Sequence, residues 1–259
     1  MPIHLSDFIR ERALNHGDPT WLAFLDMLSH RFALQFYRAW AQARPVTGMD
    51  RPQEDGFRRR IGALIGIGQA ARQQRDEVPD DARLHFSGWL TRRVHSAEGV
   101  AAVLAAFFGV PVRLERWVGH WMDMPAQERT RLGASVVNAA SRRLGSGAVL
   151  GARVWDRQHK VRLHIGPLSL AQYESLLPPG DARPVLVRWM QQLLGGELQW
   201  DAQLVLSRDE VPPTRLGAAA GGRGGTGARL GWVSWLGAAP RTRDAADVRL
   251  PGDWQVMGS

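Results

Sequence analysis

The sequence predicts an α+β protein, with a helical N-terminal part followed by two related helix-strand repeat units with long loops. The first observation is the hydrophobic period, which is helical up to Gly109 and alternates like that of strands at several places beyond it. The second is a set of short motifs that recurs in the same order in the second half. We therefore expect a mostly helical segment over 1–95, a first helix-strand unit over 96–180, and a second over 181–259 with a glycine-rich loop.

Residues 1–44 have the pattern of helices. Asp18 is suited to an N-cap, and Pro19 is suited to the first helical position. The apolar residues that follow lie at spacings of three and four, along one helix face: Trp21, Leu25, Leu28, Phe32, Phe36 and Trp40. A loop is predicted over 48–54. The second helix that follows has an apolar stripe of its own, formed by Phe57, Ile61, Leu64 and Ile65.

The first unit is predicted to begin with a helix that Ser96 caps. This helix should end at Gly109, where a left-handed C-cap is expected. Beyond it, residues 110–117 alternate like a strand, and 147–155 and 160–165 also have strand character.

A short capped helix closes the first unit, and a longer helix opens the second. Ser169 and Gln172 form a capping box that opens a short helix. A longer helix is predicted over 184–194, and 197–206 is the next strand candidate.

Five short motifs recur in register between the two units, at an offset of roughly 80 to 87 residues. In the first unit they are 107–109, 110–117, 130–133, 150–155 and 160–163. In the second unit they are 193–195, 197–206, 214–217, 230–235 and 247–250. Because five matches in register would not arise together by chance, the sequence indicates an internal duplication.

The composition is that of a globular chain of 259 residues, of which 44% are apolar. No apolar run is long enough to span a bilayer and the first residues are polar, so we expect neither a membrane insertion nor a leader. The absence of cysteine excludes disulfides, thiolate metal sites and cysteine nucleophiles. These features predict a cytoplasmic protein.

The chain is strongly basic, with a formal net charge of +8 and a pI of about 11.2. Such a balance is typical of nucleic-acid-binding proteins. Lys160 is the only lysine, however, and the arginines are scattered and interleaved with acids. We therefore expect a solvated basic surface and no bound nucleic acid, and we keep a basic nucleic-acid-binding protein as the alternative.

No residue pattern indicates a catalytic, metal or cofactor site. The eight histidines are dispersed without metal-ligand spacing, and there is no Gly-x-Ser-x-Gly motif. The glycines of 66–71 lack the preceding strand of a dinucleotide-binding motif, and those of 221–235 lack the lysine and hydroxyl residue of a phosphate-binding loop. A hydrolase whose carboxylate pair assembles only in space stays open as an enzymatic alternative.

The sequence contains eleven tryptophans and only two tyrosines. Large rings concentrate in cores and at interfaces, so we expect some of them at protein contacts. The apolar residues that follow the glycine-rich stretch are Leu230, Trp232, Val233 and Trp235. They would form the tip of a flexible arm that meets a hydrophobic pocket of a partner. The alternative is that Trp232 and Trp235 fill the protein's own core.

Several stretches, each weak alone, combine into a specific pattern: 2–6, 18–19, 24–26, 30–32, 36–40, 153–157, 162–168, Tyr173, 176–178 and 229–236. In this combination the chain resembles TssG, the wedge-protein family of the type VI secretion baseplate. Members usually carry a further segment upstream of the part that resembles 2–6, so we expect this chain to begin inside the family's usual length. The resemblance implies a non-catalytic structural role in the cytoplasm, near the inner membrane.

The resemblance also implies partners. TssG-like subunits bind two TssF subunits and engage TssK trimers through two projecting loops, and other baseplate, sheath or hub components are further candidates. In the first loop, the residues expected to bind a partner are Leu132, Leu150, Val154 and Trp155. In the second loop, they are Leu216, Leu230, Trp232, Val233, Trp235 and Leu236.

Overall fold

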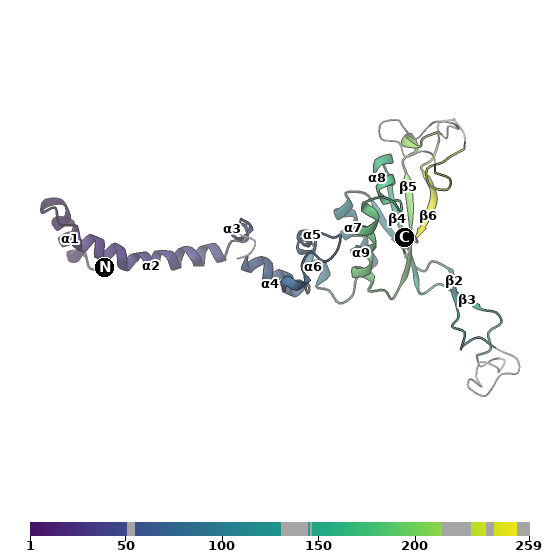
Figure 1. The fold of residues 1–259 in the computed structure, drawn as a ribbon, viewed down its shortest axis with the longest axis horizontal. Coiled ribbons are helices and arrows are strands. Elements are labelled where there is room, and N and C mark those ends of the chain that lie inside the picture. Colours follow the sequence, from purple (N-terminus) through teal and green to yellow (C-terminus); the bar gives the residue numbers. More distant parts are fainter. Residues whose placement is uncertain (51–54, 131–144, 146, 214–228, 237–240, 253–259) are drawn as a thin grey trace. The chain divides into compact units, whose positions relative to one another are not determined.

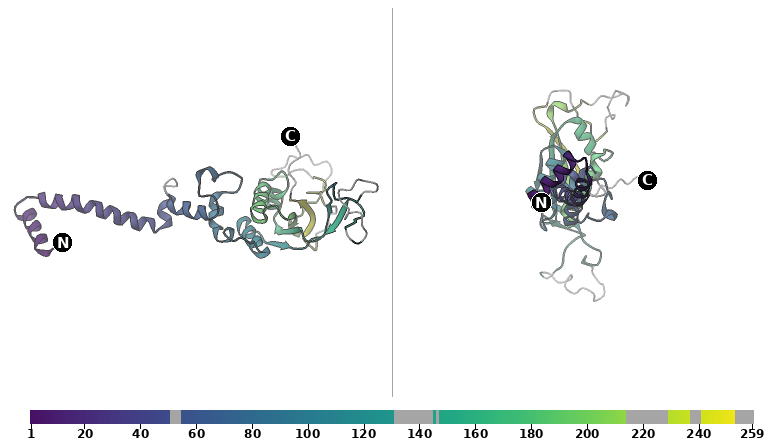
Figure 2. Two further views of the ribbon diagram at one scale, coloured as in Figure 1. Left: turned by 90° about the horizontal axis from the view of Figure 1, so that it is seen from below. Right: turned by 90° about the vertical axis from the view of Figure 1, so that its left-hand side faces the viewer.

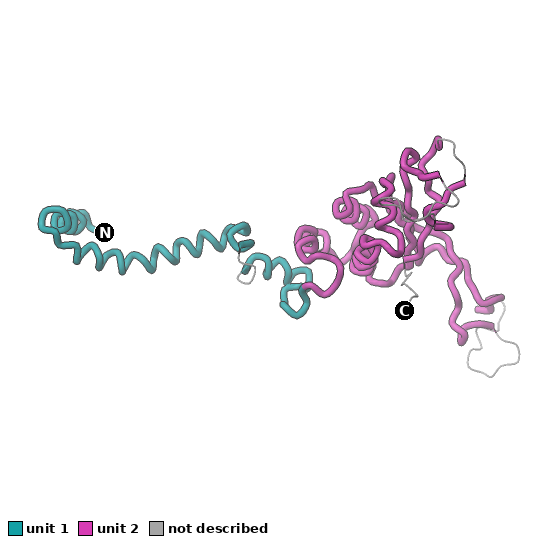
Figure 3. The backbone as a smooth tube through the Cα atoms, turned by 45° about the horizontal axis from the view of Figure 1, so that its top comes forward, with its two compact units in different colours: residues 1–73 teal, residues 74–259 magenta. Residues whose placement is uncertain are grey.

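The computed structural model describes residues 1–50, 55–130, 145, 147–213, 229–236 and 241–252. The chain divides into two compact units, over 1–73 (unit 1) and 74–259 (unit 2), which Figure 3 shows in different colours. The described part of unit 1 is helical, whereas unit 2 combines helices with strands (Figure 1). The α+β class expected from the sequence is therefore confirmed.

Unit 1 consists of α1 (Ile3–Asn15), α2 (Thr20–Gln42), α3 (Pro45–Met49), α4 (Gly56–Leu64) and the 3₁₀ turn η1 (Ala70–Arg72). Asp18 joins the first two helices. Its Oδ1 accepts hydrogen bonds from the backbone N–H of Thr20 at 3.1 Å and from the Thr20 hydroxyl at 2.6 Å, and its Oδ2 accepts one from Arg12 at 2.8 Å. These bonds lower the pKa of Asp18 to about 2. The expected N-cap is shifted by one residue, because Pro19 is the N-cap of α2 and Asp18 precedes it. Asp18 still accepts the backbone N–H of Thr20, the first helical residue.

Unit 1 has almost no core. Among its described helical residues, only Ile9 and Gly62 are buried. The last α-helix described in this unit, α4, ends at Leu64, and Gly66 follows it with a left-handed φ of 83°.

Unit 2 is built on a four-stranded sheet of β1 (Val112–Glu115), β4 (Lys160–Leu168), β5 (Gln199–Leu206) and β6 (Ala245–Pro251), in the order β1-β4-β5-β6. β4 and β5 are parallel, and the two outer pairs are antiparallel. In the register, Leu163 lies opposite Leu114 on one side and Ala202 on the other, and Ala202 lies opposite Leu250. These residues share one face of the sheet, which is therefore apolar.

Helices cover this apolar face (Figures 1 and 2). They are α5 (Asp80–His85), α6 (Ser87–Leu90), α7 (Ala97–Phe108), α8 (Leu170–Leu176) and α9 (Ala182–Leu194). The side chains of α7, α8 and α9 join the strands in one cluster, whose largest fully buried members include Trp189, Tyr173, Leu104, Leu163 and Leu204. The predicted caps are confirmed: Ser96 Oγ accepts from Gly99 N–H at 3.1 Å, and Gly109 has a φ of 65°. The capping box of Ser169 and Gln172 is also formed.

The opposite face of the sheet is polar. Asp201 accepts hydrogen bonds from Arg162 at 2.6 and 3.0 Å, and Lys160 Nζ lies 3.0 Å from its Oδ2. Burial by itself would raise the pKa of Asp201, but the hydrogen bonds from Arg162 and Lys160 outweigh it and hold this pKa below its ordinary value. On the neighbouring strands, His164 Nε2 lies 2.7 Å from Glu115 Oε2. Several charges of this face therefore pair across the strands.

Unit 2 presents the same order of elements twice. α7 leads into β1 and, after a long connection, β4; α9 leads into β5 and, after a second long connection, β6. The two strand pairs, β1–β4 and β5–β6, can each be viewed from the helix-covered face with β1 and β5 pointing upward. In this view β4 lies on one side of β1, whereas β6 lies on the other side of β5. The β1–β4 pair therefore cannot be superposed on the β5–β6 pair by a rotation that keeps the helices on the same face. For this reason the internal duplication stays a prediction.

The first long connection contains a separate two-stranded ribbon, formed by the antiparallel strands β2 (His120–Asp123) and β3 (Arg153–Asp156). The second contains the 3₁₀ turn η4 (Arg208–Glu210). Within the described ranges, no helix has the length and the apolar character needed to cross a membrane.

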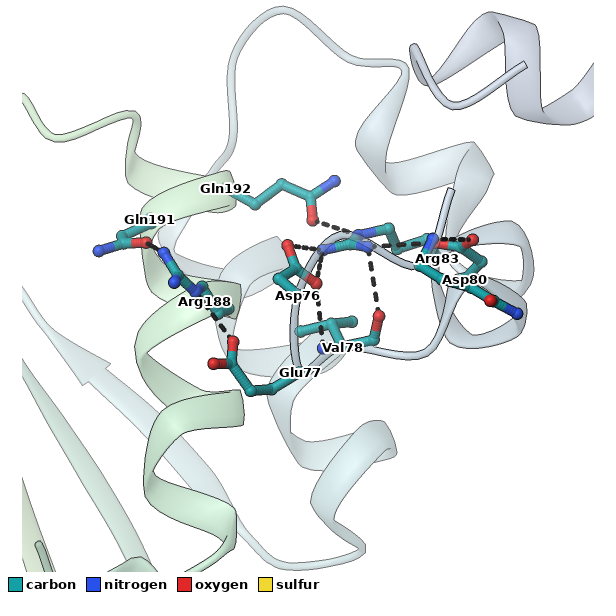
Figure 4. A network of polar contacts seen from close by, with 9 residues as sticks. Asp76, Glu77, Val78, Asp80, Arg83, Arg188, Gln191 and Gln192 are labelled. Atoms are coloured by element: carbon teal, nitrogen blue, oxygen red, sulfur yellow. Dashed lines mark hydrogen bonds and ion pairs between the residues drawn. The ribbon is translucent and has the colours of Figure 1, made fainter. Parts of the chain in front are cut away.

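A polar network ties the first segment of unit 2 to α9 (Figure 4). Arg83 is at its centre and is only 6% exposed. Its guanidinium donates to both oxygens of Asp76 at 2.6 Å, to Asp80 and the Val78 carbonyl at 3.2 Å, and to Gln192 of α9 at 3.0 Å. The bonds to Asp76, Val78 and Asp80 order the loop before α5, and the bond to Gln192 connects this segment to α9.

Candidate partner-binding surfaces

The largest exposed apolar surface of unit 1 belongs to α2. None of its 23 residues is buried. Most of its large apolar side chains are between 43% and 79% exposed: Trp21, Leu22, Phe24, Met27, Leu28, Phe32, Leu34, Phe36, Tyr37 and Trp40. An amphipathic helix of a globular protein buries its apolar stripe, and large exposed apolar patches mark interaction sites. The stripe predicted from the sequence is thus present, with Leu25 half-buried, but it does not face a core among the described residues of unit 1.

A second exposed apolar surface lies on the β2–β3 ribbon. Trp121 and Trp155 are directly opposite each other in the register and pack edge to face, with ring centroids 5.4 Å apart. They remain 60% and 53% exposed. Gly119 lies directly under the Trp155 ring, at a distance that leaves no room for a Cβ. The ring pair is therefore held in place while its outer surface stays open to solvent.

The base of the ribbon is fixed by polar contacts of Asp156. Its Oδ2 accepts backbone N–H bonds from His159 at 2.9 Å and Gln158 at 3.1 Å, and lies 3.8 Å from Nδ1 of the buried His120. The backbone bond from His159 is the main cause that lowers the pKa of Asp156. Asp156 thus terminates β3 with a turn that leads directly into β4.

The residues expected to bind a partner in the first loop lie in different surroundings. Trp155 is on the ribbon, Leu150 is fully exposed beside it, and Val154 is half-buried. Leu132 lies outside the described residues. The structure thus leaves Trp155 and Leu150 accessible to a partner.

The second loop segment, 229–236, is anchored to the core of unit 2. The Tyr173 hydroxyl donates to the Trp232 carbonyl at 2.8 Å, and Trp235 Nε1 donates to Asp247 at 3.3 Å. Trp235 is 7% exposed and Val233 is 6% exposed. Burial, with a smaller contribution from the charge of Asp247, raises the pKa of Tyr173, so its hydroxyl remains a donor.

These contacts correct the expected position of two residues. Val233 and Trp235 belong to the core cluster and not to the surface, because the segment folds back over Tyr173 and β6. Trp232 is half-buried against the same cluster. Leu230 and Leu236, each 97% exposed, are the apolar residues of this segment that a partner could contact, while Leu216 lies outside the described residues.

Sequence reasoning missed two exposed tryptophans of the ribbon. Trp121 lies on β2, a strand that was not expected, and Trp117 precedes it with 59% of its surface exposed. Trp117 also has a left-handed φ of 62°, a conformation that is uncommon for a bulky residue and concentrates at functional sites. The available signal was the close spacing of these two rings, four residues apart.

The described residues contain no group of three or more metal-binding side chains. Their carboxylates form ion pairs or hydrogen bonds with arginines at several places, such as Arg153 with Asp123 at 2.6 Å and Arg188 with Glu77 at 2.9 Å. Such pairing fits the expected solvated basic surface. The candidate sites among the described residues are therefore the exposed apolar surfaces.

Residues 1–237 match the model of a protein family described as "Type VI secretion, TssG". The chain belongs to the TssG family. The match covers both α2 and the ribbon. It confirms the family that the sequence resembles.

Two solved structures resemble this TssG-family chain. One is a cryo-electron microscopy structure of the type VI secretion TssK-TssF-TssG baseplate subcomplex, with a TM-score of 0.65 and 20% identity over 86% of this chain and 91% of that one. The other is a baseplate complex from the type VI secretion system, with a TM-score of 0.59 and 25% identity over 97% of this chain and 68% of that one. The first likeness concerns the fold alone. No curated protein sequence matches the chain.

Proposed function

We propose that this TssG-family chain is a non-catalytic structural subunit of the type VI secretion baseplate wedge. In this role it binds two TssF subunits and docks TssK trimers through two loops, on the cytoplasmic side near the inner membrane. The observation that carries the proposal is the concentration of large apolar side chains outside the core, on α2 and on the β2–β3 ribbon. A subunit that functions only within an assembly needs such surfaces, because its partners complete their burial.

The two loops occupy corresponding places in unit 2. One connects β1 with β4, and the other connects β5 with β6. Each presents at least one nearly fully exposed leucine, Leu150 in the first loop and Leu230 with Leu236 in the second. Similar apolar tips would suit two copies of the same partner, which supports their assignment to TssK trimers.

We assign α2 to TssF. An apolar stripe at helical spacing is the usual recognition element of helix-in-groove and helix-bundle contacts. Phe32 and Phe36 are 66% and 79% exposed on this stripe, so they offer anchor side chains without loss of any internal packing.

The loop assignment is tested by co-expression with TssF and TssK, followed by affinity purification through this chain. Trp121→Ala with Trp155→Ala alters the first loop, and Leu230→Ser with Leu236→Ser alters the second. We expect each pair to lower the amount of TssK recovered to about half, and the combination of both pairs to remove it, while TssF is retained.

The control for this experiment is Val94→Ser, which changes a residue that is 81% exposed and lies on neither loop. It should leave TssK recovery unchanged. Full recovery of TssK with all four loop substitutions would contradict the loop assignment.

The α2 assignment needs a separate pair of variants in the same co-expression. Phe32→Ser with Phe36→Ser should remove TssF from the purified complex, whereas Arg31→Ser on the same helix should not. Circular dichroism of the variants shows whether the helical content is retained. Recovery of TssF with the double phenylalanine variant at the wild-type level would exclude α2 as its binding surface.

A further inference from the structure

The edge of the four-stranded sheet formed by β1 is open. Within the described part of the chain, β1 pairs with β4 alone. The Pro111 carbonyl accepts the N–H of Gly166 at 2.9 Å, so residue 111 faces β4. Because backbone groups of an antiparallel strand alternate in direction, the N–H and C=O groups of Val112 and Leu114 point away from the sheet. An open edge of this kind is a template for another strand.

A groove lies along this edge. It has a volume of about 620 Å³ and is lined by residues of α7 and β1. Its wall on α7 is formed by Ala101, Ala102 and Ala105, whose methyl groups leave room beside the strand. On the strand side it is lined by Val112 and Leu114, the same residues that direct their backbone groups outward.

The charges at the groove favour an acidic occupant. Arg113 and Arg116 line it and are both exposed, and no ion pair with a carboxylate is formed by either of them among the described residues. Glu98 also lines the groove, so the local net charge is smaller than that of the two arginines alone. The formal net charge of the whole chain, which includes these residues, is +8 and has the same sign.

We propose that the β1 edge and the α7 groove together form a docking site for an extended acidic segment of a partner protein. The segment adds a fifth strand next to β1 and bonds to the outward backbone groups of Val112 and Leu114. Its alternate side chains, which are small or branched and apolar, enter the alanine-lined groove. The acidic residues between them meet Arg113 and Arg116. This site is separate from the surfaces assigned to TssF and TssK.

The probe is a fluorescent hexapeptide of alternating Glu and Val, compared with the same peptide carrying Lys in place of Glu. Both are titrated into the full chain, and binding is followed by fluorescence anisotropy at low ionic strength. We expect the Glu peptide to bind at least about tenfold more tightly than the Lys peptide. We also expect it to slow hydrogen exchange of the Val112 and Leu114 amides, which a purely electrostatic contact would not do.

Two variants separate the contributions of charge and of the groove. Arg113→Glu with Arg116→Glu should reverse the preference between the two peptides. Ala102→Trp fills the groove from an exposed helix position and should weaken the Glu peptide by about tenfold without altering β1. Thermal unfolding verifies that both variants remain folded. Equal affinity for the two peptides, or binding without protection of Val112 and Leu114, would overturn the proposal.

Discussion

At the scale of single residues, the network around Arg83 links distant parts of unit 2. The side chain is 7% exposed, and it bonds to carboxylates before and within α5 as well as to Gln192 of α9 (Figure 4). Arg188 of the same helix pairs with Glu77 beside it, but both of those side chains are nearly half-exposed. The two arginines therefore make similar ion pairs at very different degrees of burial.

We predict that Arg83→Met lowers the free energy of unfolding by about 3–5 kcal/mol, because it leaves two carboxylates partly or fully buried without their partner. The matched control Arg188→Met removes an exposed pair and should cost about 0–1 kcal/mol. Urea unfolding of both variants, followed by circular dichroism, measures the difference. Equal destabilisation by the two substitutions would contradict a special role for burial at Arg83.

Asp201 gives a prediction about pH. Its pKa is lowered in the folded protein, so the unfolded state binds protons more readily and the folded state loses stability as the pH falls. The stabilisation is fully present above the ordinary carboxyl pKa of about 3.9 and is lost as the pH falls through the lowered folded value. The stability difference between wild type and Asp201→Asn should therefore shrink below about pH 4. Acid unfolding curves of the wild type and of Asp201→Asn measure this convergence.

At the scale of elements, the β2–β3 ribbon lies outside the four-stranded sheet of unit 2. Its two strands form a sheet of their own, and a two-stranded sheet by itself is only marginally stable. The Trp121–Trp155 pair contributes about 0.5–1.5 kcal/mol beyond its buried area. The pair therefore stabilises the ribbon locally while it remains available for contact with a partner.

Two tryptophan substitutions test whether the Trp121–Trp155 pair stabilises only the ribbon. Trp155→Ala should increase hydrogen exchange within the ribbon but change global stability by about 1 kcal/mol or less. Trp189→Ala removes a fully buried ring of α9 and should cost about 3–5 kcal/mol in thermal or urea unfolding. A large global effect of Trp155→Ala would show that the ribbon is part of the folding core.

At the scale of the whole molecule, the core belongs to unit 2. All members of the main core cluster lie between Val78 and Leu250, whereas the described helices of unit 1 bury only Ile9 and Gly62. Helices without tertiary packing are marginal in water. The stability of unit 1 must therefore come largely from contacts outside the unit itself.

We predict that a fragment of residues 74–259 unfolds cooperatively by itself, with a stability close to that of the whole chain. A fragment of residues 1–73 should show weak, non-cooperative helicity and a tendency to associate, since the stripe on α2 is exposed. Circular dichroism and analytical ultracentrifugation of both fragments measure these properties. A sharp unfolding transition of monomeric 1–73 would contradict this division of stability.

Much of the secondary structure could be predicted from the sequence because its signals are local. Ser96, Gly109 and the Ser169–Gln172 capping box mark helix ends through bonds made within a few residues. The strand predicted over 197–206 corresponds to β5. β2 was missed because a four-residue strand of an isolated ribbon has almost no period, and its existence depends on β3, some thirty residues away.

The sequence by itself determined the α+β class, several helix ends, the family and the presence of apolar segments after glycines. Only the tertiary structure decided which tryptophans are available to a partner. Trp155 and Trp235 occupy corresponding places in the repeated motifs, yet Trp155 is exposed on a ribbon outside the main sheet and Trp235 packs on Tyr173 beside β6. The physical reason is that burial depends on residues brought together from distant parts of the chain, which no local pattern records.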